Sequence, residues 1–64
     1  MENELRQWRR AAGLTQSQVA KALGLRSAST VCMWENGTRR PRVDRLVVLA
    51  ELFGCTVDQL LKRQ

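Results

Sequence analysis

Histidine is absent from this 64-residue sequence, and it has only two cysteines and one proline. The cysteines, Cys32 and Cys55, are far apart and form no C-x-x-C motif, so neither a zinc site nor a redox dithiol is expected. No apolar run approaches the roughly 18 residues that cross a membrane, and the charged residues 1–10 lead into no signal-peptide core. We therefore expect no metal, no cofactor and no membrane association, and a cytoplasmic protein.

The short length of the chain limits its organisation. Because so short a chain buries only roughly 60% of its unfolded surface, we expect one small domain over residues 1–64. A content of 44% hydrophobic and 27% charged residues is typical of a folded chain. We do not expect an enzyme, because the sequence has no histidine, no metal-ligand set, no nucleophile motif and no length for a substrate cleft.

The charge of the chain is strongly positive. Eleven Lys and Arg residues against six Asp and Glu residues give a net charge of +5, and nine of the eleven cations are arginine. Arginine binds phosphate groups in a two-pronged geometry, so a polyanion is the first partner to consider. The alternative is a basic surface that serves only solubility.

Helix stop and start signals divide the chain into five segments. Glycine is favoured just past the end of a helix because it adopts positive φ angles easily. The glycines are Gly13, Gly24, Gly37 and Gly54. Thr15 with Gln18, and Thr56 with Gln59, have the S/T-x-x-E/Q spacing of a capping box, which predicts helix starts near residues 16 and 57.

Apolar residues recur at helical spacing in each segment. The positions are Leu5, Trp8 and Ala12; Val19, Ala20 and Leu23; Val31 and Trp34; Leu46, Leu49, Ala50 and Phe53; and Val57, Leu60 and Leu61. Only residues 29–33 show an alternation of apolar and polar residues like that of a strand, and helix start and stop signals lie on both sides of them. We therefore predict an all-α domain of five helices.

The second and third segments carry a specific motif. It consists of residues 15–25, Val31, the run Trp34-Glu35-Asn36-Gly37, and Pro41. This pattern resembles the Cro and phage-repressor type of helix-turn-helix domain, the lambda-repressor-like or XRE family. The resemblance covers nearly the whole chain and implies a compact five-helix domain with the helix-turn-helix at helices two and three.

That resemblance also implies a function. Such domains bind double-stranded DNA sequence-specifically as transcriptional regulators, often repressors, and work as homodimers on pseudo-palindromic operators in the prokaryotic cytoplasm or nucleoid. The third helix, about residues 28–35, is then the recognition helix in the major groove. An alternative within the same fold is a protein-interaction module such as an antitoxin or adaptor. RNA binding is less favoured because the few aromatic residues are needed in the core.

The turn between the second and third helices departs from the family pattern. Ala20 must be small where these helices cross, and Gly24 must turn the chain. Between Gly24 and Val31 the chain carries one residue more than the usual spacing. We expect Arg26 to be the extra residue and Ser27 to be the N-cap of the third helix.

The register of the third helix predicts which residues face DNA. Val31, Trp34 and Glu35 share one face and should point into the domain, so the opposite face should read bases. The expected base-reading residues are Ala28, Ser29, Thr30, Cys32 and Met33. Hydroxyl groups favour single hydrogen bonds to bases, and soft apolar groups favour contacts with thymine methyl groups. We therefore expect modest sequence specificity. A redox role for the Cys32 thiol is an alternative, but no thiolate-stabilising partner is evident.

Basic and polar residues flank this helix and are expected to bind phosphate. The candidates are Gln16, Arg26, Asn36, Arg39, Arg40 and Arg42. Gln16 opens the second helix, where family members usually contact a phosphate. For Arg26, a contact to a base is an alternative to a contact with phosphate. The alternative for the whole set is a solvated polar surface.

Two further residue pairs have expected roles. In the family, the residues matching Arg9 and Glu35 form a partly buried ion pair between the first and third helices, so we assign them to structure. Val48 and Leu52 lie outside the inward face of the fourth helix. They either meet across a dimer contact or are covered by the fifth helix. Trp8 is expected in the core together with Trp34.

Overall fold

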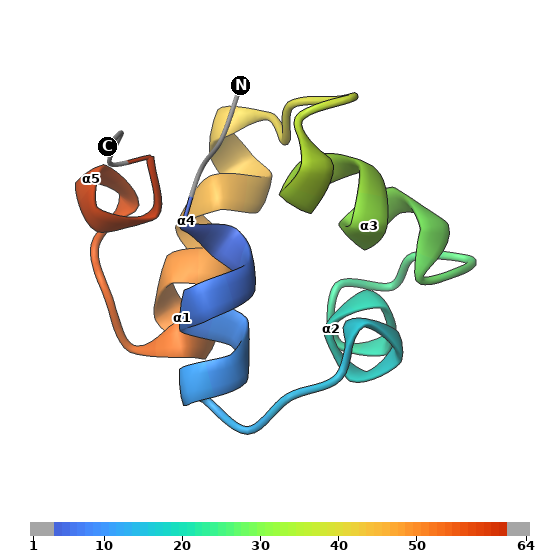
Figure 1. Cartoon of the computed structure of the whole chain (residues 1–64), viewed down its shortest axis with the longest axis horizontal. Coiled ribbons are helices and arrows are strands. Elements are labelled where there is room, and N and C mark those ends of the chain that lie inside the picture. Colours follow the sequence, from blue (N-terminus) through green and yellow to red (C-terminus); the bar gives the residue numbers. More distant parts are fainter. Residues whose placement is uncertain (1–3, 62–64) are drawn as a thin grey trace.

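The computed structural model describes residues 4–61 and contains only helices over that range. The helices are α1 (Leu5–Ala11), α2 (Gln16–Ala22), α3 (Ser29–Asn36), α4 (Val43–Phe53) and α5 (Val57–Leu60). In Figure 1, α2 and α3 lie on one side of the molecule, α1 and α4 in the middle and α5 on the other side. The predicted all-α, five-helix fold is confirmed.

Both predicted capping boxes are present. The Thr15 hydroxyl accepts a hydrogen bond from the Gln18 backbone N–H at 3.0 Å, and the Gln18 side chain accepts one from the Thr15 N–H at 2.8 Å. The Thr56 and Gln59 pair repeats this arrangement at 3.1 and 2.9 Å. Each box satisfies two N–H groups that would otherwise lack partners, so the starts of α2 and α5 follow directly from local sequence.

The end of α2 shows why glycine is needed in the turn. Gly24 has a φ angle of +72°, and its N–H donates to the Lys21 carbonyl at 3.1 Å. The Leu25 N–H reaches back to the Ala20 carbonyl at 2.8 Å, which completes a Schellman motif. All four glycines have positive φ angles, so the predicted stop signals are confirmed.

All five helices contribute to the core: α1 packs against both α3 and α4, α2 packs against α3, and α5 packs against α4. Its buried hydrophobic residues are Leu5, Val19, Ala20, Leu23, Val31, Trp34, Leu46, Leu49, Ala50, Phe53 and Leu60. The expectation for Trp8 was wrong in part, since this side chain packs against the core but stays partly exposed beside Gln7 and Gln59. Ala12, expected on the same apolar face, is exposed and lies just past the end of α1 at Ala11.

The connection from α2 to α3 also differs from expectation. Ala28, not Ser27, is the N-cap of α3, because the first helical hydrogen bond of α3 runs from the Cys32 N–H to the Ala28 carbonyl. The Ser27 hydroxyl still accepts a hydrogen bond from the Ser29 N–H at 3.3 Å. Ser27 therefore satisfies a backbone group near the helix start without being the cap.

Candidate nucleic-acid interface

The two faces of α3 have opposite environments. Val31, Trp34 and Glu35 are buried, with 3%, 5% and 8% of their surfaces exposed. On the other side Ser29 is exposed, and Met33 is partly exposed. The inward face is the one that the sequence predicts, and it fixes the rotation of the helix.

The expected base-reading residues differ in how far they reach solvent. Thr30 and Cys32 are partly exposed, as Met33 is, although full exposure was expected for Met33. Ala28 is partly exposed and lies at the N-cap, outside the helix itself. The helix thus covers residues 29–36 where 28–35 was expected, because its first hydrogen bond is accepted by the carbonyl of Ala28.

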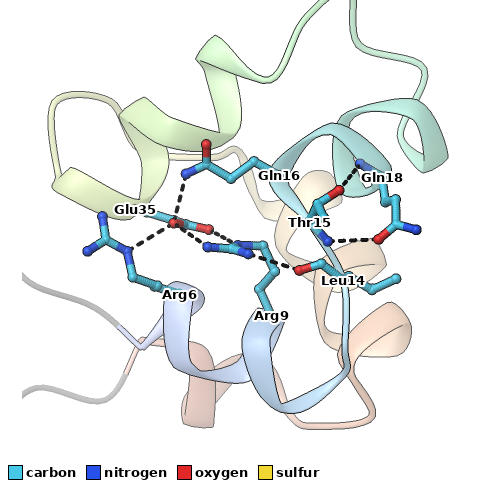
Figure 2. A network of polar contacts seen from close by, with 7 residues as sticks. All are labelled: Arg6, Arg9, Leu14, Thr15, Gln16, Gln18 and Glu35. Carbon is cyan, nitrogen blue, oxygen red and sulfur yellow. Dashed lines mark hydrogen bonds and ion pairs between the residues drawn. The ribbon is translucent and has the colours of Figure 1, made fainter.

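A buried carboxylate at the end of α3 joins three helices, as Figure 2 shows. Arg9 of α1 donates from Nε to Oε2 of Glu35 at 2.6 Å and from Nη2 to Oε1 at 3.3 Å. Arg9 also donates from Nη1 to the Leu14 carbonyl at 2.9 Å. The structure therefore places Arg9 and Glu35 in the direct ion pair that the family resemblance implies, and it ties the α1–α2 connection to the same site.

Two further donors meet the Glu35 carboxylate. Gln16, at the start of α2, donates from Nε2 to Oε1 at 3.0 Å, and Arg6 of α1 donates from Nε to the same oxygen at 3.2 Å. The sequence predicts a phosphate contact for Gln16 and no particular role for Arg6. The signal for Arg6 was its position three residues before Arg9, which places both on one side of α1.

The surroundings of Glu35 determine its ionisation. Burial raises the pKa of this carboxyl group, but hydrogen bonds from Arg9, Gln16 and Arg6, with the charge of Arg9, outweigh that effect. The pKa of Glu35 is consequently below its ordinary value of 4.5, so the side chain is a carboxylate at neutral pH. Among the described residues, no buried side-chain nitrogen or oxygen atom lacks a hydrogen-bond partner.

The segment after α3 is a short polar loop. The Asn36 side-chain oxygen accepts a hydrogen bond from the Thr38 N–H at 2.9 Å, which orients the side chain of Asn36 at the surface. Arg39, Arg40 and Arg42 are exposed along residues 39–42, just before α4. These expected phosphate contacts therefore gather at the C-terminal end of α3.

Two other arginines lie outside this loop. Arg26 is exposed in the α2–α3 connection, near the start of α3. Arg45 has a different role, because its Nη1 donates to the Leu23 carbonyl at 2.7 Å and so ties α4 to the end of α2.

A comparison with protein families identifies the architecture. The helix-turn-helix family matches residues 5–60, which cover all five helices. The chain belongs to the helix-turn-helix family. The predicted resemblance to the Cro and phage-repressor type is thereby confirmed.

Curated helix-turn-helix proteins are similar to this chain. An uncharacterized HTH-type transcriptional regulator, YobD of Bacillus subtilis, is 39% identical over 57 residues, which are 89% of this chain and 50% of YobD. The HTH-type transcriptional regulator AnsR of Bacillus subtilis is 36% identical over 62 residues, 97% of this chain and 53% of AnsR. The HTH-type transcriptional activator BcrR of Enterococcus faecalis is 34% identical over 58 residues, 91% of this chain and 28% of BcrR. The chain thus spans about half or less of the length of these relatives.

The helix-turn-helix domain exposes apolar side chains on α4. Val48 is 43% exposed, whereas Leu52 is partly buried against the core. The two expected dimer residues therefore have different surroundings. Val43 and Val47 are also exposed, at 74% and 45%. The exposure of Val43 and Val47 was not predicted, because the sequence pattern was interpreted only for the inward face of α4 and for Val48 and Leu52.

Membrane-spanning helices and metal-binding groups are both absent from residues 4–61. No helix in this range is long and apolar enough to cross a membrane. No group of three or more His, Cys, Asp or Glu residues in the same range could hold a metal ion.

Proposed function

We propose that this helix-turn-helix domain, residues 1–64, binds double-stranded DNA sequence-specifically and regulates transcription. The orientation of α3 carries the proposal. With Val31, Trp34 and Glu35 packed inward, the polar and soft apolar side chains of α3 face away from the core. A helix held this way presents its outer face to the major groove, which is wide enough to admit it.

The outer face of α3 supplies the base contacts in this proposal. The base-reading residues are Ala28, Ser29, Thr30, Cys32 and Met33. Hydroxyl groups give single hydrogen bonds, and the Met33 and Cys32 side chains contact thymine methyl groups. Asn36, the one residue of α3 with an amide side chain, lies at the far end of the helix. The readout is therefore of modest specificity.

Polar and basic residues on both sides of α3 supply the phosphate contacts. These residues are Gln16, Arg26, Asn36, Arg39, Arg40 and Arg42. Phosphate contacts set the position of a protein on the duplex and give most of the affinity, but carry no sequence information. The net charge of +5 favours the same partner.

The domain acts as a homodimer at least when bound to DNA. One recognition helix reads only a few base pairs, so two copies on half-sites one helical turn apart read a longer pseudo-palindromic site. The exposed Val48, with Val47 beside it and Leu52 at its edge, provides the apolar contact on α4. A dimer bound to such a site is sufficient to repress transcription, and we propose repression as the regulatory outcome. The relative BcrR, in contrast, is named as an activator.

Salt dependence of duplex binding tests this function. Affinity measured by fluorescence anisotropy should fall steeply as salt rises. Arg40→Ala and Arg42→Ala should each reduce the salt slope by about one unit and weaken binding to all sequences alike. Lys21→Ala, which removes an exposed charge near the end of α2, serves as the control. An affinity that does not depend on salt would contradict the proposal, and selection from a random duplex pool would then identify no site.

Sedimentation tests the dimer separately. On a duplex with two half-sites, the wild-type protein should bind as two copies, whereas Val48→Glu should bind as one copy with the same salt slope per copy. Persistent one-to-one binding of the wild-type protein would exclude the homodimer. A protein-interaction module of the same fold would show neither salt-dependent duplex binding nor a selected sequence.

A further inference from the structure

The Glu35 carboxylate has more cationic partners than charge balance requires. Arg9 neutralises it from inside the domain, with hydrogen bonds to both carboxylate oxygens. Arg6 brings a second guanidinium group to Oε1, so the three charged side chains have a net charge of +1. This excess charge lies at the surface, because the Arg6 side chain is 50% exposed while that of Glu35 is 1% exposed.

Arg6 adds little to stability in this position. The Arg6 side chain is half exposed, so water screens its attraction to Glu35, which Arg9 already neutralises. The interaction of Arg6 with Glu35 uses only Nε, and Figure 2 shows that its two terminal nitrogens point away from the carboxylate. These terminal N–H groups form the fork with which arginine binds phosphate oxygens.

Gln16 lies beside Arg6 at the same oxygen. One N–H of its Nε2 donates a hydrogen bond to Glu35 Oε1 at 3.0 Å, and the same nitrogen carries a second N–H. Gln16 comes from α2 and Arg6 from α1, so a single carboxylate of α3 orients donors from two other helices. Side chains held in this way lose less rotamer freedom when they bind a ligand.

We propose that Arg6 is a further phosphate-contacting residue and that Arg6 and Gln16 together bind one stretch of the DNA backbone. Glu35 orients both side chains through its Oε1 atom, which accepts a hydrogen bond from each. This inference rests on the proposed function and adds to it a cation on α1, outside the helix-turn-helix. It also couples the contacts on α1 and α2 to the placement of α3, because Glu35 belongs to α3 and is packed in the core.

Arginine variants on α1 test this site in the full chain. Arg6→Ala should reduce the slope of log affinity against log salt by about one unit, and lower the affinity about tenfold at 0.1 M salt. Arg10→Ala is the matched control, because Arg10 is exposed on the same helix and carries the same charge but does not bind Glu35. This control should leave the slope unchanged. Equal effects of the two variants would overturn the proposal, since any nearby positive charge would then suffice.

A charge-conserving variant distinguishes orientation from charge. Arg6→Lys keeps the cation but lacks Nε and the fork, so we expect the salt slope to be retained and the affinity to fall about threefold. Nuclear magnetic resonance of the wild-type protein gives an independent measurement. The Nε–H signal of Arg6 should shift on addition of duplex, whereas that of Arg10 should not, and an unmoved Arg6 signal would also overturn the proposal.

Salt-dependent duplex binding of the wild-type protein and its variants separates an error in the role of Arg6 from an error in the proposed function. If the wild-type protein shows no salt-dependent duplex binding, the proposed function itself is wrong. If the wild-type protein binds, and Arg40→Ala reduces the salt slope while Arg6→Ala does not, only the role of Arg6 is wrong.

Discussion

Arg9 and Glu35 face each other across the boundary between α1 and α3, with the Arg9 Nε 2.6 Å from the Glu35 Oε2. Both residues are largely buried, at 9% and 8% exposed. Since Arg9 also binds the Leu14 carbonyl, the pair fixes α3 against α1 and against the segment that leads into α2. The ion pair therefore sets the position of the helix whose outer face we propose to read DNA.

Removal of the Arg9 charge should strongly destabilise the domain. In Arg9→Met the apolar stem is retained, but Glu35 loses its main partner while still largely buried. Breaking a buried ion pair on one side costs roughly 3 to 5 kcal/mol, comparable to the total stability of so small a core. Urea unfolding followed by circular dichroism should show a chain that is largely unfolded at 25 °C. Arg10→Ala, an exposed neighbour, should change the free energy of unfolding by less than about 0.5 kcal/mol.

Stability should also depend on the ionisation of Glu35. Its pKa in the folded state is below the ordinary value of 4.5, so protonation favours the unfolded chain. The stabilisation that this carboxylate gives to the folded state is fully present above pH 4.5. It is lost as the pH falls through the lower pKa that Glu35 has in the folded state. Urea unfolding between pH 7 and pH 2 should show this loss in the wild-type protein. Glu35→Gln should have a shallower decline in the same acid range, and an equal decline would contradict the assignment.

The Gly24 turn permits a test of backbone strain alone. A Cβ atom at Gly24 would meet no atom within 4 Å, so substitution introduces no steric contact. The φ angle of +72° is nevertheless unfavourable for alanine. Gly24→Ala should therefore reduce the free energy of unfolding by about 1 kcal/mol. Gly24→Asn should cost less, because asparagine tolerates this conformation better. If either variant lowered the free energy of unfolding by several kcal/mol, a steric clash at residue 24 would be indicated, which contradicts the open space around this position.

Local signals in the sequence predict the helix ends well. Thr15 and Thr56 form capping boxes with residues three positions later, and such hydrogen bonds depend only on neighbouring residues. The inward register of α3 is equally accessible, because Val31 and Trp34 lie three residues apart.

Tertiary contacts are harder to predict. Trp8 sits on the apolar face of α1 yet remains partly exposed, since burial depends on what α4 and α5 cover. The Arg45 bond to Leu23 and the Arg6 bond to Glu35 join residues 22 and 29 positions apart, which no local pattern encodes. The Ser27 expectation failed because the first helical hydrogen bond of α3 is accepted by the carbonyl of Ala28, one residue further along the chain.

Substitution of Met33 tests the proposed base readout. Met33 is partly exposed on the outer face of α3, opposite the buried Val31 and Trp34, so Met33→Gln should leave the fold intact. A glutamine amide forms paired hydrogen bonds with adenine, whereas methionine contacts thymine methyl groups, so the sequences selected from a random duplex pool should change. The salt slope should stay the same because the substitution is uncharged. Met33→Leu, which keeps an apolar side chain of similar size, should select nearly the wild-type sequences. If Met33→Gln selects unchanged sequences while still folded, Met33 does not face the bases, and the outer face of α3 lies differently on the groove.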